Sequence, residues 1–152
     1  MNFLLSWFEL IDIKPIKLFS YAACVSPGDN LSGSSGFFSS PNFPSNFPIN
    51  KNCTWNITVP AGRIIKVTFL TFTLDPSQLT DCTGGVGLPS VLITNVASDD
   101  GEQEFKICGT DLPYPVYSVG NSIQVTLQSG GTGYSGFNAS YEAIDKELCK
   151  SA

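Results

Sequence analysis

Residues 53–59 read CTWNITV, with an apolar side chain at every second position. Successive side chains of a β-strand point to opposite faces of a sheet, so this alternation predicts a strand with one buried face and one wet face. Trp55 is placed on the buried face, where a core role is favoured over a ligand platform. Asn56 is placed on the wet face.

The same alternation recurs twice later in the chain. It is clear in residues 121–128, NSIQVTLQ, and in residues 137–143, FNASYEA, which put Asn138 on a polar face. Further strand candidates, separated by glycine- and proline-containing turns, are residues 64–74, 91–95, 104–107 and 116–119. Seven or more short strands without helical periodicity predict an all-β fold, an antiparallel β-sandwich.

Residues 33–48, GSSGFFSSPNFPSNFP, stand out by composition. Proline fixes φ and removes a hydrogen-bond donor, so this segment is expected to be an extended or turning approach to the strand at Cys53. Its aromatic side chains are interpreted as packing on the sandwich edge, in preference to a binding groove.

Length and charge exclude several functions. The 152 residues, with 42% hydrophobic and 14% charged residues, fit one folded domain. The absence of histidine removes the usual general base and His-ligated zinc. A net charge of −5 disfavours nucleic acid. No catalytic residue and no cofactor is therefore expected, and the protein is interpreted as a non-enzyme.

Cysteines and glycosylation sequons indicate an oxidising compartment. The cysteines are far apart, without a CxxC pair that favours zinc, so disulfides are expected. Candidate Asn-x-Ser/Thr glycosylation sites are Asn30, Asn52, Asn56 and Asn138. The predicted localisation is extracellular, by secretion.

Residues 1–23 are interpreted as an atypical targeting-like or non-domain segment. Their apolar run, residues 3–8, is short for a signal peptide, and acidic and basic residues follow it. The run is also too short to span a bilayer, which takes about 20 apolar residues.

Several ordered motifs resemble the CUB domain, an extracellular β-sandwich module. They are SGFFSSPNFPSNFP, NCTWNITVPAGRIIKVTF, FTLD before Cys82, CGTDLP around Cys108, NSIQVTLQS and GFNASYEAI. The resemblance covers residues 24–144, which leaves residues 145–152 as a tail or the start of a following module. It implies the disulfides Cys24–Cys53 and Cys82–Cys108. Cys149 is left over, and is interpreted as the first cysteine of a next module or an interchain link, with an inert thiol as the alternative.

Many CUB domains bind calcium through three acidic positions. The resemblance puts the first at Asp75, the second at Pro89 or Ser90 and the third at Gly130, so two of the three carboxylates are absent. Because calcium prefers several carboxylate oxygens, we expect this domain to lack the family's site. For Asp75 itself, a strand-end turn with Pro76 is favoured over a weak cation or lysine site.

Two other motifs have simpler interpretations. Residues 131–136 form a literal GxGxxG, but a strand pattern follows it, so a strand connection is favoured over nucleotide binding. Residues 99–104, DDGEQE, do not fit an EF-hand and are expected to be a solvated turn.

The sequence as a whole predicts a non-enzymatic module that binds extracellular proteins or glycans, as part of a larger multidomain secreted or cell-surface protein. One alternative is an accessory domain of an extracellular protease whose catalytic domain lies outside this chain. Another is a free-standing carbohydrate-binding domain resembling the spermadhesins.

Overall fold

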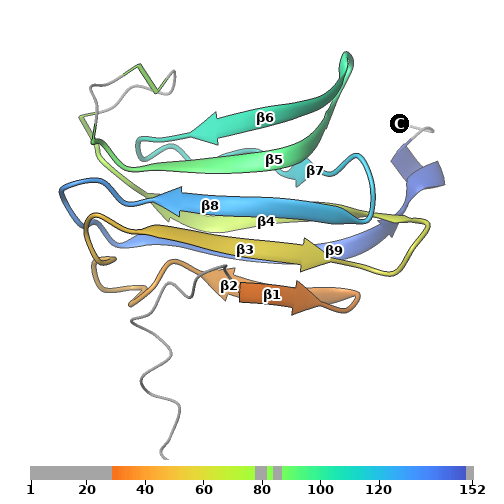
Figure 1. Cartoon of the computed structure of the whole chain (residues 1–152), viewed down its shortest axis with the longest axis horizontal. Helices are drawn as coiled ribbons and strands as arrows, with labels where there is room; N and C mark the ends of the chain where they lie inside the picture. Colours follow the sequence, from red (N-terminus) through yellow and green to blue (C-terminus); the bar gives the residue numbers. More distant parts are fainter. Residues whose placement is uncertain (1–28, 78–81, 84–86, 150–152) are drawn as a thin grey trace, which may run out of the picture.

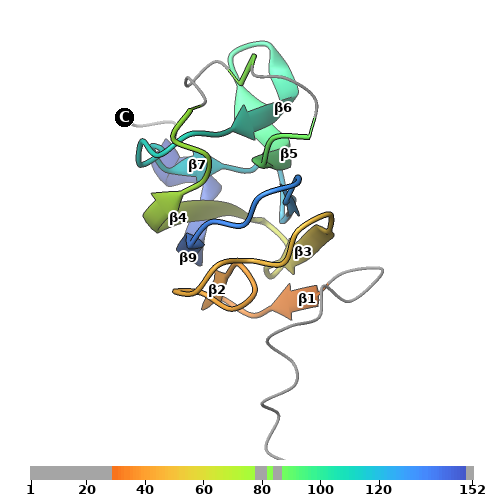
Figure 2. The same cartoon turned by 90° about the vertical axis from the view of Figure 1, so that its left-hand side faces the viewer.

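The computed structural model describes residues 29–77, 82–83 and 87–149. Its strands and one short 3-10 helix are, in chain order, β1 (Asp29–Ser32), β2 (Ser35–Ser39), β3 (Asn52–Thr58), β4 (Arg63–Thr73), β5 (Ser90–Ser98), β6 (Gly101–Ile107), β7 (Val116–Tyr117), β8 (Ser122–Gln128), β9 (Gly136–Asp145) and η2 (Lys146–Cys149). They form two packed layers, a five-stranded sheet in the order β1-β3-β8-β5-β6 and a four-stranded sheet in the order β2-β9-β4-β7 (Figures 1 and 2). The predicted β-sandwich is confirmed.

The alternating stretches that founded the prediction are β3, β8 and β9. β3 and β8 pair antiparallel over their whole length, with Trp55 opposite Val125 and Asn56 opposite Gln124. Burial follows the alternation. Trp55 and Val125 lie in the core, and the residues that alternate with the buried ones along β3 and β8 face outward. Asn56 and Asn138 both lie on outward faces, as expected.

The aromatic residues of the core join the two sheets. The ring centroids of Trp55 in the five-stranded sheet and Phe137 in the four-stranded sheet lie 5.4 Å apart in edge-to-face geometry. Phe69, in the same sheet as Phe137, lies equally 5.4 Å from it, also edge to face. Such pairs add about 0.5–1.5 kcal/mol beyond the burial of their area. Trp55 is therefore a core residue, and the prediction that it is no exposed platform is confirmed.

The segment of residues 33–48 contains more regular structure than its composition suggested. Residues 35–39 form β2, which pairs antiparallel with β9, and β1 precedes it and pairs parallel with β3. Phe38 and Phe47 are buried, as expected of aromatics packed on the sandwich edge, but Phe37 is 75% exposed. Proline in residues 41–48 confines the turning part of the segment to the stretch after β2.

One predicted disulfide lies among the described residues. Cys82 and Cys108 are bonded, with their Cα atoms 5.6 Å apart, and they tie the loop after β4 to the end of β6. Cys53 is buried in β3. Its predicted partner Cys24 lies outside the described residues, so the pair Cys24–Cys53 stays a prediction. Cys149 is the last residue of η2, and its role likewise stays a prediction.

Candidate functional site

Asp75, the only retained calcium position, lies in a turn directly after β4. Its carboxylate accepts hydrogen bonds from the Ser77 hydroxyl at 2.6 Å and from the Ser77 backbone N–H at 2.8 Å. Tyr134 donates a further side-chain hydrogen bond. These donors, Ser77 first, lower the pKa of Asp75 from its ordinary value of 3.8, against the opposing effect of burial. The expected strand-end turn is thus present, and its carboxylate is already well satisfied.

The two substituted calcium positions have local structural roles of their own. The Ser90 hydroxyl donates to the Gln128 side-chain oxygen at 3.2 Å. Gly130 has a φ of 62°, and a β-carbon at this position would collide with the backbone carbonyl of Gly87. An aspartate at position 130 is therefore incompatible with this backbone. Across residues 29–77, 82–83 and 87–149, Asp, Glu and Cys side chains form no group of three or more that could hold a metal ion.

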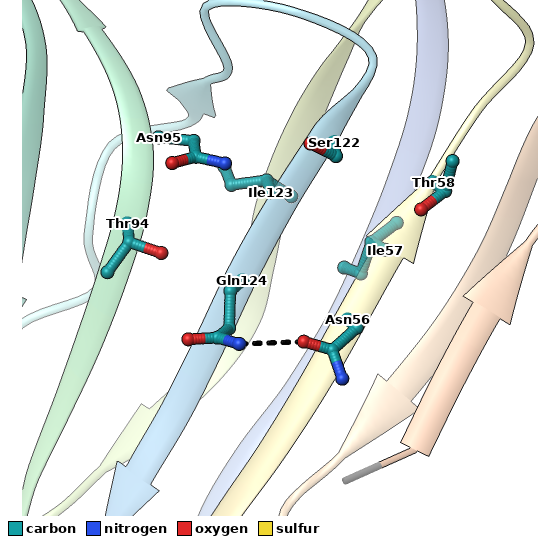
Figure 3. A pocket seen from close by; sticks show the side chains of 8 residues that line it. All are labelled: Asn56, Ile57, Thr58, Thr94, Asn95, Ser122, Ile123 and Gln124. Carbon is teal, nitrogen blue, oxygen red and sulfur yellow. Dashed lines mark hydrogen bonds between the residues drawn. The ribbon is translucent and has the colours of Figure 1, made fainter. Parts of the chain in front are cut away.

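The outer face of the five-stranded sheet is polar and uncharged over β1, β3 and β8. Every outward position of these strands is Asn, Gln, Ser or Thr. A shallow pocket of about 310 Å³ lies on this face, over β3, β8 and β5. Figure 3 shows its hydroxyl and amide groups, with the Gln124 amide donating to the Asn56 side-chain oxygen at 2.7 Å.

The other edge of the same sheet carries an apolar groove. The register pairs Phe105 of β6 with Ile93 of β5, so both side chains point to the inner side of the sheet. Ile93 is completely buried, whereas Phe105 is 47% exposed. The facing sheet ends in β7, which has only two residues, Val116 and Tyr117. Phe105 therefore lies on an inner face that the opposite sheet does not cover.

Proline explains why β7 is so short. Pro115 directly precedes it and has no backbone N–H to extend the ladder with β4. The chain between β6 and β7 instead runs as an irregular loop along the groove. The groove encloses about 790 Å³ between the end of β5, β6 and residues 111–117. Leu112 and Tyr114 of the loop are exposed, Tyr114 to 91%.

The rim of the groove is predominantly acidic. Glu104 and Asp111 line it together with a single cation, Lys106. Further carboxylates, also exposed, lie next to the groove in the β5–β6 hairpin, at Asp99, Asp100 and Glu102. Opposite charge on a partner favours encounter and register at such a rim.

A family model for the CUB domain matches residues 27–141 of the chain. The chain belongs to the CUB domain family. Procollagen C-endopeptidase enhancer 1 of Rattus norvegicus is 32% identical over 113 residues, which cover 72% of this chain and 22% of the relative. Cubilin of Sus scrofa is 34% identical over 126 residues, 78% of this chain and 3% of the relative. The chain thus spans a small part of each of these relatives.

Solved structures agree with this family. The extracellular region of zebrafish Gpr126/Adgrg6 matches with a TM-score of 0.64 and 29% identity, over 78% of this chain and 15% of that one. The calcium-bound second CUB domain of MASP-1 matches with a TM-score of 0.63 over 76% of this chain and 97% of that one. At 21% identity, the second likeness supports the fold alone. Within the part of the chain that the structure describes, no helix is long and apolar enough to cross a membrane.

The structure separates the residues that the sequence singled out in this CUB domain. Asn30, Asn52 and Asn56 gather on the outer face of the five-stranded sheet, while Asn138 lies on the other sheet. Asp75 lies apart from them, after β4. Of residues 99–104, which were expected to form a turn, only residues 99–100 do so, because the exposed residues 101–104 already belong to β6. Residues 131–135 lie in the connection between β8 and β9, as expected, and Gly136 begins β9.

The apolar groove was missed by sequence reasoning. Its one sequence signal is the pair Pro113 and Pro115, which limits the strand that follows. Phe105 itself fits an inner-face strand pattern and gives no sign that it is exposed.

Proposed function

We propose that this CUB domain is a non-enzymatic interaction module of an extracellular protein, and that it binds an extended segment of another protein in the groove beside β6. The observation that carries the proposal is Phe105, an inner-facing aromatic side chain that is 47% exposed. Exposed apolar surface with a polar rim is typical of protein interaction sites. The aromatic side chains around it, Tyr114 and Tyr117, are of the kind enriched at such sites.

The chemistry of the groove selects the class of partner. Among the described residues β6 pairs with β5 alone, so its other side offers backbone groups to an added strand. Alternate side chains of that strand would point toward Phe105 and Leu112. The excess of carboxylates at the rim favours lysine or arginine in the bound segment. The partner is therefore an extended segment that is apolar and basic.

The absence of catalytic function and the extracellular setting have separate support. The chain has no histidine. The Cys82–Cys108 disulfide and the sequons are features of secreted proteins. The much greater length of the relatives supports a place in a multidomain protein.

A random-peptide display library provides the probe that tests the groove. The wild-type domain, secreted from eukaryotic cells, should enrich peptides that combine apolar and basic residues. Leu112→Asp and Tyr114→Ser should each weaken the binding of the enriched peptides by at least about fivefold, because anchor residues contribute more than about 1 kcal/mol. Binding is measured by surface plasmon resonance with the synthetic peptides.

Phe37→Ser is the matched control, because Phe37 is an exposed aromatic residue on β2, in the other sheet. This variant should bind the same peptides as the wild type. A library that yields no binder, or binders that the groove variants retain in full, would refute the proposed site.

One observation favours the alternative of an accessory domain for an extracellular protease. Several relatives are named procollagen C-endopeptidase enhancers, a name that connects them to an endopeptidase. A catalytic domain encoded in the same full-length transcript would select this alternative. A glycan array with a signal that survives Leu112→Asp would instead select the carbohydrate-binding alternative.

A further inference from the structure

β6 presents different side chains on its two faces. Phe105 lies on the inner side of the sheet, opposite Ile93 of β5, and is 47% exposed. Glu102 and Glu104 alternate with it along the strand, so they point to the outer side, and both are exposed. Figure 1 shows β6 as the outermost strand, next to β5. A strand added at this edge would therefore meet apolar surface on one face and two carboxylates on the other.

The hydrogen-bond pattern of the sheet shows which backbone groups of β6 are directed to this edge. At the end of the ladder between β3 and β8, the Val59 N–H donates to the Asn121 carbonyl at 2.9 Å. Backbone groups of alternate residues point to opposite sides of a strand, and the registers carry this alternation from β8 through β5 to β6. Phe105 thus directs its backbone groups toward β5, whereas Glu102 and Glu104 direct theirs away from it.

The end of β6 is closed to an added strand. The Cys82 sulfur lies 3.7 Å from the Lys106 carbonyl oxygen, which is directed to the same edge because Lys106 lies two residues after Glu104. The disulfide between Cys82 and Cys108 fixes this part of the loop beside the strand. An added strand is therefore limited to residues 101–105.

We propose that the segment bound at β6 carries two basic residues separated by one residue, opposite Glu102 and Glu104, and an apolar residue opposite Phe105. This inference rests on the proposed function and specifies its partner. Directly opposed side chains of paired strands have their β-carbons about 4.5–5.5 Å apart, close enough for opposite charges to attract. The residue between the two basic ones faces Gln103, which is uncharged. The pattern is basic-x-basic-apolar for a segment parallel to β6, and the reverse order for an antiparallel one.

The two faces of the sheet disfavour basic residues at adjacent positions. Adjacent side chains of a strand point to opposite faces, so one of the two cations would enter the groove. It would replace an apolar side chain that removes Phe105 and Leu112 from water. Asp111 is the carboxylate at the groove that such a cation would meet, so dependence on Asp111 distinguishes this arrangement from the proposed one.

The random-peptide display library tests the spacing. The wild-type domain should enrich peptides with Lys or Arg at positions two apart more often than at adjacent positions. The double variant Glu102→Lys/Glu104→Lys should instead enrich Asp or Glu at the same spacing, because the charges of the outer face are reversed.

Surface plasmon resonance with a synthetic peptide from the wild-type set measures the contribution of each carboxylate. Glu102→Gln and Glu104→Gln should each weaken binding about 1.5- to 5-fold at low salt, the range of one exposed ion pair, and the loss should shrink at high salt. Asp29→Asn is the matched control, because Asp29 lies exposed on β1 at the opposite side of the same sheet. This variant should bind the peptide as the wild type does.

Hydrogen exchange followed by NMR gives a readout that does not depend on charge. The backbone N–H of Glu104 should exchange more slowly in the complex, because the added strand accepts its hydrogen bond. An exchange rate that the peptide leaves unchanged would refute the addition of a strand to this edge.

The remaining contrary results separate this inference from the proposed groove. Peptides that lose affinity for Leu112→Asp but keep it for Glu102→Gln and Glu104→Gln would refute the pattern and leave the groove in place. Enriched peptides with predominantly adjacent basic residues, or binding that depends on Asp111 in place of the two glutamates, would do the same. A library that yields no binder would refute the groove and the pattern together.

Discussion

The turn at Asp75 and the groove beside β6 are both candidate sites, and they differ in how far their surface groups already have partners within the domain. The Asp75 carboxylate is buried and accepts hydrogen bonds from Ser77 and Tyr134. The groove, in contrast, leaves Phe105 and Tyr114 in water. A charged residue whose hydrogen bonds are already made offers little to a ligand, whereas uncovered apolar surface gains free energy when a partner removes it from water.

The largest expected effect on the free energy of unfolding tests whether the inner face of the five-stranded sheet is covered at β5 and uncovered at β6. Ile93 and Phe105 are cross-strand partners on the same face. Ile93→Ala should lower the free energy of unfolding by about 2–5 kcal/mol, because it leaves a cavity in the core. Phe105→Ala should lower it by less than about 1.5 kcal/mol, because much of that ring is already in water. Urea unfolding measured by circular dichroism gives both values.

Equal losses at the two positions would contradict this difference, since they would mean that Phe105 is packed as tightly as Ile93. Val125→Ala provides a second fully buried reference on the neighbouring strand β8. It should resemble Ile93→Ala and not Phe105→Ala.

A smaller effect on the free energy of unfolding is expected from Asp75, whose carboxylate already accepts hydrogen bonds. Asp75→Asn should destabilise the domain at neutral pH by about 1–2 kcal/mol, because hydrogen bonds to the charged carboxylate are lost or weakened. The pKa of Asp75 is lowered in the folded state. Its contribution is therefore present above the unfolded-state pKa and is lost as pH falls through the folded value. The gap between wild type and variant should close in acid, as followed by urea unfolding over a pH series.

Asp100→Asn is the matched control, because Asp100 lies exposed in the β5–β6 turn. This variant removes the same charge and should show the same dependence of the free energy of unfolding on pH as the wild type. If the difference in free energy of unfolding between wild type and Asp75→Asn stayed constant from neutral to acid pH, it would contradict the role given to the Ser77 hydrogen bonds.

The smallest expected effect is that of calcium. The substitutions at the second and third positions predict that sub-millimolar calcium leaves the Tm unchanged, since a ligand that binds the folded state would raise it. Calorimetry with calcium and with chelator measures the shift. A rise in Tm that disappears in Asp75→Asn would overturn the prediction and would identify Asp75 as a ligand.

The sequence predicted most of the fold because the alternation of apolar and polar residues that indicates a strand lies within a few neighbouring residues. Alternation in residues 53–59 determined which side chains enter the core, and the paired strand β8 repeated the same pattern. The short strand β1 was missed because four residues carry too little alternation, and its pairing with β3 is parallel and depends on distant contacts. β2 was missed because the glycine, serine and proline around it are typical of turns.

The positions of most strands along the chain and the faces of their side chains were thus determined by the sequence, as were the outward positions of Asn56 and Asn138, because side chains alternate with a period of two. Only the tertiary structure decided that Phe105 is uncovered, that Asn30 lies beside Asn56, and that Gly130 approaches Gly87 too closely for a side chain. The physical reason is the same in each case. These are relations between segments distant in the chain, and they depend on how the strands pair and on how far one sheet extends over the other.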